Sequence, residues 1–192
     1  MIAIIDYGAG NTRSLFAALS RLGVQANITD KHDEIASAEK VILPGVGQAL
    51  AAYRQLEKQN LIDLIPSLSQ PVLGICLGMQ LLAGFNEEGN IEGIGVFKER
   101  VRRFPSTDVV PHMGWNGLEE FSGTLFKDFQ KDDNVYFAHS YYVEQGPDTV
   151  GTTSYILPFS AALHRENFYG VQFHPEKSAN VGEKILLNFL SL

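Results

Sequence analysis

The sequence contains a single cysteine, Cys76, among its 192 residues, so no disulfide can form within the chain. A lone thiol is typical of a reducing compartment, and we expect a cytoplasmic protein in which Cys76 is either a small buried hydrophobe or a reactive group. No apolar run approaches the ~18 residues of a membrane-spanning helix, and no basic segment precedes a hydrophobic stretch at the N-terminus. The sequence therefore argues against a membrane span and a secretory signal.

Basic residues are also few. The chain has 15 Lys and Arg against 22 Asp and Glu, which gives a formal net charge of −7 at pH 7. A protein that follows a phosphate backbone ordinarily carries an excess of basic side chains, so we expect no nucleic-acid partner. The one basic cluster, Lys98 to Arg103, is either the solvated face of a strand or a docking surface. The histidines show no metal-ligand spacing, and we expect neither a metal nor a cofactor.

The first half of the chain alternates short apolar runs with stretches whose apolar residues recur at helical spacing. Such alternation implies right-handed crossovers and a parallel sheet. Helices are expected after Asn11, around Leu50–Leu56 and from Leu77. The expected strands are Met1–Asp6, Val24–Ile28, Val41–Leu43 and Pro71–Ile75.

The second half changes character, because Gly, Asn and Asp punctuate short segments that suit antiparallel or mixed strands. The last segment, Val181–Leu190, is an amphipathic helix pattern. We therefore expect one α/β domain over residues 1–192, with a flavodoxin-like open mixed sheet flanked by helices. The expected strands of this half are Gly95–Phe104, Val135–Val143, Val150–Tyr155 and Phe168–Phe173.

The first motif that carries chemistry is Gly74-Ile75-Cys76-Leu77-Gly78, at the junction of an expected strand and an expected helix. It has the form of a nucleophile elbow with cysteine in place of serine. The turn would hold the thiol near the positive end of the helix, which favours the thiolate, and would direct the Leu77 N–H at an oxyanion. The alternative is an inert core thiol beside glycines that permit close packing.

Two further motifs follow expected strands. Because a cysteine nucleophile needs a general base, and the base needs an acceptor that fixes its tautomer, His174 and Glu176 of a His-Pro-Glu motif are candidates for these roles. They could equally be a surface histidine and a solvated carboxylate. The segment Pro44-Gly45-Val46-Gly47 would expose main-chain N–H groups at the sheet edge that carries Cys76, or would be a plain turn.

Together these motifs resemble the class I (triad) glutamine amidotransferases, in the same order and over essentially the whole chain. A finer pattern is similar to the glutaminase subunits of imidazole glycerol phosphate synthase, an enzyme of histidine biosynthesis. Thr12 and Ile156 depart from that pattern, and we expect them to change local loop shape rather than activity. The segments that carry the finer resemblance are Ile5–Asn11, Leu43–Gly47, Pro111–Asn116 and His174–Ser178.

The resemblance implies a role for each matching residue. Cys76 would attack the side-chain amide carbon of glutamine, His174 would carry the protons and Glu176 would orient the imidazole. The products would be ammonia and, through a glutamyl thioester that water hydrolyses, glutamate. Backbone groups at Leu77, Val46 and Gly47 would hold the oxyanion. The residues implied for glutamine binding are Gly45, Gly47, Gln80, Ser140 and Tyr141.

The resemblance also implies a protein partner, a (β/α)8-barrel cyclase subunit that receives the ammonia in a heterodimer. The cyclase would make imidazole glycerol phosphate and an aminoimidazole carboxamide ribotide. Trp115, the only tryptophan, is either a gate that stacks at this interface or a core aromatic. The residues implied for the interface are Pro111, His112, Met113, Trp115, Asn116, Tyr136 and Lys177.

Other functions stay open at this point. The chain could be the glutaminase subunit of another synthase, a cysteine peptidase with a similar elbow, or a flavodoxin-like regulatory module with a vestigial triad. If it is a glutaminase, we expect weak activity without the partner, because Gly45 and Gly47 allow the peptide at Val46 to flip. We also expect activity to fall at acid pH, because His174 must be neutral as a base or paired with a thiolate.

Overall fold

The structure, a computed structural model, describes residues 1–8 and 10–192. Its first half alternates strands and helices, because each short apolar run fills a buried strand and each following stretch places its apolar side chains on one helical face. In chain order these elements are β1 (Ile2–Ile5), α1 (Thr12–Arg21), β2 (Ala26–Thr29), α2 (His32–Ala36), β3 (Lys40–Leu43), α3 (Ala49–Lys58), α4 (Leu61–Ser67), β4 (Val72–Ile75) and α5 (Leu77–Leu82).

The second half consists mainly of strands and ends in a helix. Its elements are β5 (Phe85–Asn86), β6 (Ile91–Glu92), β7 (Arg100–Arg103), β8 (His112–Gly117), β9 (Glu120–Phe121), the 3-10 turn η1 (Thr124–Phe126), β10 (Asn134–His139), β11 (Tyr141–Val143), β12 (Thr149–Ser154), β13 (Pro158–Arg165), β14 (Phe168–Val171), the 3-10 turn η2 (Pro175–Lys177) and α6 (Ala179–Leu190).

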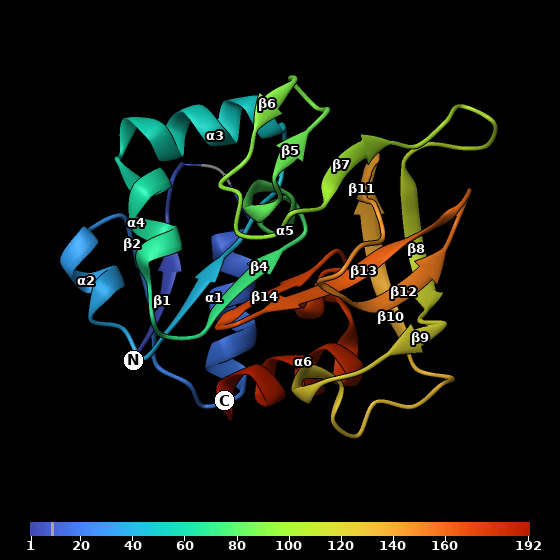
Figure 1. The fold of residues 1–192 in the computed structure, drawn as a ribbon. Coiled ribbons are helices and arrows are strands. Elements are labelled where there is room, and N and C mark those ends of the chain that lie inside the picture. The colour runs from blue at the N-terminus through green and yellow to red at the C-terminus, as the bar shows by residue number, and fades with distance from the viewer. Residues whose placement is uncertain (9) are drawn as a thin grey trace.

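Most strands belong to one sheet whose two parts differ in direction. The strands β2, β1, β3, β4 and β14 are neighbours in that order and all run parallel. Beyond β14, the strands β13, β11 and β7 follow with antiparallel pairing. Figure 1 shows the parallel part on the left and the antiparallel part on the right. The open mixed sheet flanked by helices, predicted from the sequence, is confirmed.

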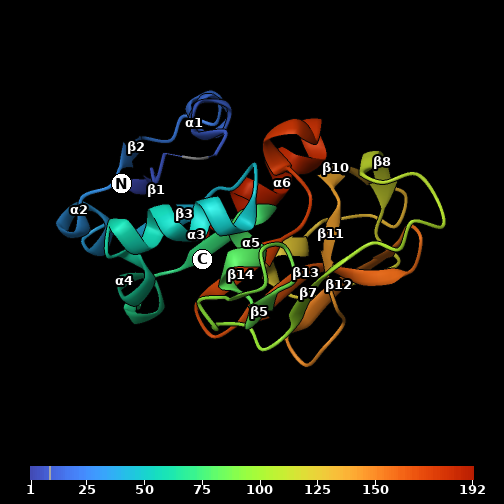
Figure 2. The ribbon, with the colours of Figure 1, turned by 90° about the horizontal axis from the view of Figure 1, so that it is seen from above.

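Each face of the parallel sheet is covered by its own group of helices. Alternate side chains of β1 point to opposite faces, so Ile2 and Ile4 belong to one hydrophobic cluster while Ala3 and Ile5 belong to the other. Helices α1 and α6 contribute buried side chains to the first cluster, and α3, α4 and α5 contribute to the second. Figure 2 shows α1 and α6 on one side of the strands and α3 and α4 on the other.

The carboxyl ends of the parallel strands bring distant segments to one edge of the sheet. Tyr7 follows β1, Pro44 follows β3, Cys76 follows β4 and Gln172 follows β14. In open α/β sheets this edge is where ligands bind. The topology alone therefore gathers the three sequence motifs in one place.

A separate pair of strands, β8 and β10, runs beside this edge. The pairing is antiparallel and sets Trp115 opposite Tyr136 and His112 opposite His139. The sequence predicted one strand from Val135 to Val143, which is wrong, because the chain breaks at Ser140. Before Ser140 the chain pairs with β8, and after it with β7 and β13.

Other element boundaries also differ from the expectation. The predicted strand Gly95–Phe104 is a strand only in β7, and β2 begins two residues later than predicted, at Ala26. The sequence did not predict α2, α4 or β13. The strand β13 is rich in residues with low strand propensity, Ser160 and Ala161–Ala162, yet it lies buried between β14 and β12. Tertiary packing there outweighs local preference.

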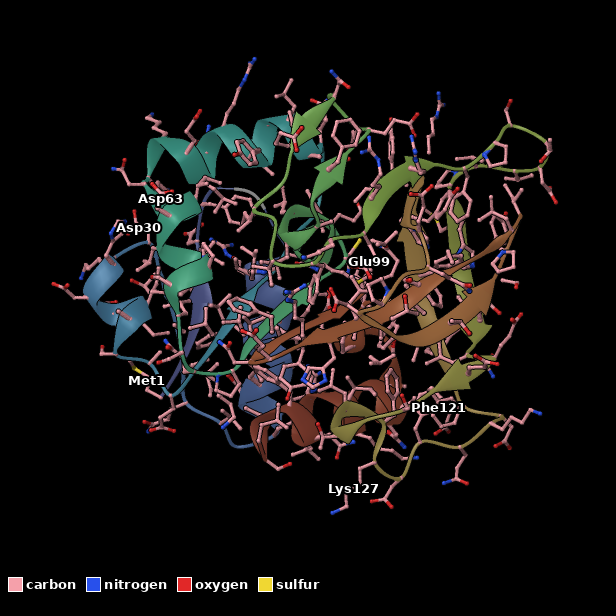
Figure 3. All side chains as sticks on the ribbon, viewed as in Figure 1. Met1, Asp30, Asp63, Glu99, Phe121 and Lys127 are labelled. Atoms are coloured by element: carbon pink, nitrogen blue, oxygen red, sulfur yellow. The ribbon has the colours of Figure 1, made fainter. Side chains whose placement is uncertain are left out.

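Charged side chains lie mostly at the periphery, as Asp30, Asp63 and Lys127 do in Figure 3. One buried exception is Glu99, whose carboxylate accepts a hydrogen bond from the Asp148 backbone N–H at 2.9 Å. This bond ties the loop after β11 to the segment before β7.

The basic cluster lies on and beside β7. Arg100 lies over the Phe85 ring at 4.2 Å, and Arg102 pairs with Glu144 at 3.1 Å. These contacts suit the solvated face of a strand, the first of the two readings. None of the helices in the described part of the chain is long and apolar enough to cross a membrane.

Candidate active site

Cys76 lies at a sharp turn between β4 and α5, with φ 52° and ψ −109°. A non-glycine residue rarely adopts a positive φ, and such strain persists only where the surroundings enforce it. Here the glycines enforce it. A Cβ on Gly78 would overlap the Leu43 carbonyl, and a Cβ on Gly45 would overlap the Gly78 backbone nitrogen. The glycines let α5 pack directly on the end of β3, with Cys76 at the apex.

The elbow brings Cys76 against His174, although the two are far apart in the sequence. The Nδ1 atom of His174 lies 2.9 Å from Oε1 of Glu176, and both side chains are 3% exposed. The Cys76 and His174 side chains line one cavity, and Cys76 is among the groups that shift the pKa of the imidazole. The three residues thus form a buried row of thiol, imidazole and carboxylate.

The surroundings favour the protonated imidazole. Burial on its own lowers the pKa of His174, but the hydrogen bonds to Cys76 and Glu176 and the negative charge of both partners outweigh it and raise the pKa to about 10. At neutral pH the His174 imidazole is therefore protonated. Of the two protonation states that the sequence left open for His174, the structure favours this one.

The His-Pro-Glu segment is fixed to β10. The backbone N–H of His174 donates to the Tyr136 carbonyl at 2.9 Å, and the Ser178 hydroxyl donates to the His174 carbonyl at 2.7 Å. The same hydroxyl accepts from the Tyr136 N–H at 2.9 Å. The position of the imidazole therefore depends on the strand that carries Tyr136.

The segment after β3 is fixed by Tyr7. The buried phenol donates a 2.7 Å hydrogen bond to the Pro44 carbonyl. Burial, with a smaller effect of the nearby Cys76 charge, raises the pKa of Tyr7 far above its usual value, so the phenol stays a donor. Beyond this anchor Gly47 has φ +97°, and open space surrounds the position of its missing Cβ. Val46 therefore lies in the chain between the anchored Pro44 and the sterically unconstrained Gly47.

A cavity of about 380 Å³ opens in front of the Cys76 sulfur. Its floor is Cys76 with Leu77 and Gln80 from α5, and its walls come from the segments after β3, β10 and β14. The residues that line it are Val46, Gly47, Cys76, Leu77, Gln80, Glu88, Pro111, Met113, Ala138, His139, Ser140, Tyr141, His174 and Lys177. The volume suits a single amino acid, and the oxyanion candidates lie beside the nucleophile.

Most residues expected to bind glutamine line this cavity. Ser140 lies between β10 and β11, Tyr141 begins β11, and Gln80 lies one helical turn beyond Cys76. Gly45 does not line this cavity and instead packs under α5. The expected contact of Gly45 with glutamine stays a prediction.

The residues expected at the interface divide into two groups. Met113 and Trp115 are 65% and 55% exposed, so Trp115 is not the core aromatic considered as an alternative. The Trp115 ring lies 5.9 Å from the Tyr136 ring, and the Lys177 Nζ lies 6.0 Å from the same ring. We call Met113, Trp115, Tyr136 and Lys177 the aromatic patch. Met113 and Lys177 of this patch, together with Pro111, line the cavity on this side.

The other two expected interface side chains are directed inward. His112 is 4% exposed and stacks between Phe137 and Tyr155, at 4.8 Å and 4.1 Å between ring centroids. Asn116 donates to the Ser154 carbonyl at 2.9 Å. The period of two along β8 explains the difference, because neighbours of exposed residues on a strand point to the other face.

Several residues of the site carry no recognisable sequence signal. Glu88 lines the cavity from the loop after β5 and accepts the Ala49 N–H at 2.8 Å, and burial raises the pKa of its carboxyl. Gln172 donates to the Cys76 sulfur at 3.6 Å. The one sequence feature that indicates Gln172 is its position two residues before His174, because alternate residues of an extended segment point to the same side. In the described residues, no three His, Cys, Asp or Glu side chains are grouped as a metal site.

Comparisons with known proteins agree with this arrangement. The sequence model of the family described as glutamine amidotransferase class-I matches residues 3–191. The solved structure of PurLQS from Thermotoga maritima superposes with a TM-score of 0.74 at 20% identity, over 99% of this chain and 97% of that one, which shows the shared fold. The chain belongs to the class-I glutamine amidotransferase family.

Named relatives place the chain more specifically within this family. The chain is 50% identical to the imidazole glycerol phosphate synthase subunit HisH of Bacteroides fragilis, over 100% of this chain and 99% of that protein. It is 45% identical to the subunit of the same name in Pasteurella multocida, over 98% and 96%. Within its family, the chain therefore groups with the HisH subunits of imidazole glycerol phosphate synthase.

Proposed function

We propose that this protein is the glutaminase subunit of an imidazole glycerol phosphate synthase, and that it hydrolyses glutamine to glutamate and ammonia. The observation that carries the proposal is Cys76 on a strained elbow, at the floor of an amino-acid-sized cavity and paired with a buried His174 and Glu176. The family supplies the reaction class, and the geometry supplies a nucleophile, a proton carrier and an orienting carboxylate.

In the first half of the reaction the Cys76 thiolate attacks the side-chain amide carbon of glutamine, which gives a tetrahedral oxyanion. His174, charged at neutral pH, donates its proton to the amide nitrogen as the C–N bond breaks. Ammonia leaves, and a glutamyl thioester stays on Cys76. The neutral imidazole then takes a proton from water, which attacks the thioester and releases glutamate, and the thiolate and the imidazolium are restored.

The tetrahedral oxyanion needs donors beside Cys76. Leu77 opens α5, so its N–H is among the first of a helix, which have no acceptor within the helix. The second donor is the peptide at Val46 and Gly47, between the Pro44 anchor and the unconstrained Gly47. Losing one such donor costs about 10²–10³ in rate, so the orientation of this peptide sets whether the enzyme is active.

Glu88 is the candidate that fixes the other end of glutamine. Its carboxylate lines the cavity that holds Cys76 and is complementary to the α-ammonium group of an amino acid. Glu88→Gln keeps the shape and removes the charge. We expect it to raise the KM for glutamine by about tenfold or more, with a smaller change in kcat, since a ground-state contact is lost.

The ammonia is delivered to a partner in this proposal. The partner is a (β/α)8-barrel cyclase subunit, which uses ammonia to make imidazole glycerol phosphate and an aminoimidazole carboxamide ribotide, and the aromatic patch is the surface that contacts it. Exposed tryptophan and tyrosine are the residues that dominate stable interfaces. The thiolate chemistry suits a reducing compartment, and we place the heterodimer in the cytoplasm.

The test is glutamate release from glutamine by the purified chain, alone and with the cyclase carrying its nucleotide substrate. We expect the partner to raise the rate by about 10²–10³, the size of one oxyanion donor. The aromatic-patch variant Trp115→Ala should weaken this activation, while Phe16→Ala, at an exposed aromatic residue on α1, leaves it unchanged. Full turnover by the isolated chain would contradict partner control. Activation by a different synthase instead would assign the chain to another pathway.

A further inference from the structure

A buried hydrogen-bonded chain of side chains ends at the Cys76 sulfur and is not used by the mechanism above. Gln172 is fully buried and Gln80 is 4% exposed. The amide nitrogen of Gln80 lies 2.8 Å from the Tyr141 carbonyl and 2.8 Å from Oε1 of Gln172. The amide nitrogen of Gln172 lies 3.6 Å from the Cys76 sulfur.

The direction of each hydrogen bond in this chain is fixed by chemistry. A backbone carbonyl only accepts, so Gln80 must present its NH₂ group to Tyr141. The second hydrogen of that NH₂ group then goes to Gln172, which must offer its carbonyl oxygen. The NH₂ group of Gln172 is thereby left to face Cys76, and it can act there only as a donor.

The anchor of the chain is itself held from a second side. The Tyr141 carbonyl also accepts a hydrogen bond from Nδ1 of His139 at 2.7 Å. Nε2 of His139 is then an acceptor, which takes the Nδ1–H of His112 at 3.1 Å. The side chains in this chain are buried and already make their hydrogen bonds. If the Gln172 amide rotated to offer its oxygen to the sulfur, Gln80 would lose its hydrogen-bond acceptor.

We propose that Gln172 is a further residue of the catalytic site, a fixed neutral donor that stabilises the Cys76 thiolate. This rests on the proposed function of Cys76 as the nucleophile. A donor that cannot accept stabilises the thiolate more than the thiol, because charged sulfur is the stronger acceptor, so it adds to the effect of the imidazolium. The sulfur's other polar neighbour among the described residues is the Ala138 carbonyl, at 4.0 Å, which interacts with the thiol hydrogen only.

The other groups that set the charge state of Cys76 stay in place when Gln172 is changed. They are His174 and Tyr7, whose pKa values both respond to the charge of Cys76. Glu88 and Lys177 line the same cavity with opposite charges. An effect of Gln172 can therefore be measured against a constant background.

The test uses the fact that Cys76 is the only cysteine, so alkylation reports this thiol alone. The rate of reaction with iodoacetamide is measured from pH 4 to pH 10 on the full chain without substrate. Gln172→Met keeps the size and removes both polar groups. Gln172→Glu keeps an acceptor for Gln80 and replaces the donor by an oxygen. Gln70→Met is the matched control, because Gln70 also donates its amide to carbonyls, Ile35 and Ala36, but far from the sulfur.

We expect the midpoint of the alkylation profile to rise by about one pH unit in Gln172→Met, the size of one charge-assisted hydrogen bond. It should rise further in Gln172→Glu and stay constant in Gln70→Met. Equal midpoints in all four proteins would overturn the proposal, as would a rise in Gln70→Met equal to that in Gln172→Met. If Gln172→Met does not fold, Gln172→Leu, which also removes the donor without adding a charge, takes its place in the comparison. The readout needs no glutamine, so a failure of the proposed function leaves it intact.

Discussion

At the scale of single residues, the charge state of His174 decides how the site works. Its imidazole lies between two groups that prefer it protonated, the Cys76 sulfur and the Glu176 carboxylate. A neutral general base with an ordinary pKa would lose activity as pH falls through about 6.5. The His174 imidazole behaves differently, because its pKa is raised to about 10 and it does not titrate near pH 6.5.

This difference gives a pH prediction. The acid limb of kcat/KM for glutamine should lie below pH 6.5, because His174, with its raised pKa, stays protonated there. Activity then falls at acid pH, but later than for a neutral base. The alkaline limb should lie near pH 10, because His174, with its pKa raised to about 10, then loses the proton that departing ammonia needs.

The profile is measured on the complex with the cyclase. The matched variant is Glu176→Gln, which keeps a hydrogen-bond acceptor but removes the negative charge that stabilises the imidazolium. Its alkaline limb should move to lower pH. An acid limb at about 6.5 in wild type, the ordinary value for histidine, would contradict the imidazolium–thiolate pair.

At the scale of elements, the buried histidine pair joins β8 to β10 and to the turn that carries Tyr141. Burial lowers the pKa of His112 to about 4. Burial, with smaller effects of neighbouring positive charge, lowers the pKa of His139 to about 3 against the effect of the Tyr141 carbonyl. Both rings are therefore neutral in the folded protein at neutral pH, and each has the single N–H that its hydrogen bond requires.

The pair should make stability depend on pH in a defined direction. Below about pH 6.5 the unfolded chain gains protons on these histidines while the folded protein does not, so the free energy of unfolding falls as pH falls. Two pH units correspond to about 2.7 kcal/mol for one such group, and we expect a loss of about 2 kcal/mol or more between pH 6.5 and pH 4.5. His174 adds nothing in this window, because its raised pKa leaves it protonated in both states.

Urea unfolding at several pH values checks this prediction. His112→Phe keeps a ring between Phe137 and Tyr155 and removes one titrating group, so the acid loss of stability should shrink. His32→Gln is the control, since His32 is exposed and bonds only the Gln59 carbonyl at the surface. An unchanged pH dependence in His112→Phe would mean that the pair is not the cause.

At the scale of the whole molecule, the sequence predicts the parallel half of the fold better than the antiparallel half. Apolar runs such as Ile2–Ile5 are buried on both faces, and their apolar composition alone predicts that burial. The strand pairing of Val135–Val143 cannot be predicted from composition, because the same alternation of residues is compatible with any neighbouring strand. The break at Ser140 depends on β7 and β8, which are distant in sequence.

The candidate site shows the same limit. Cys76, His174 and Glu176 lie in short motifs whose spacing already implies their chemistry, and the fold brings them together. Gln172 and Glu88 could not be recognised in this way. Their places follow from side-chain directions at the sheet edge and from a loop after β5, which only the three-dimensional structure shows.

The central claim is that Cys76 releases ammonia from glutamine and that the cyclase consumes it. The most direct measurement compares wild-type and Cys76→Ala chains, each bound to the cyclase, with either glutamine or an ammonium salt as nitrogen source. We predict that Cys76→Ala abolishes product formation from glutamine but leaves formation from ammonium unchanged, which shows that the complex is intact. Product formation from glutamine by Cys76→Ala, at a rate near that of wild type, would contradict the account.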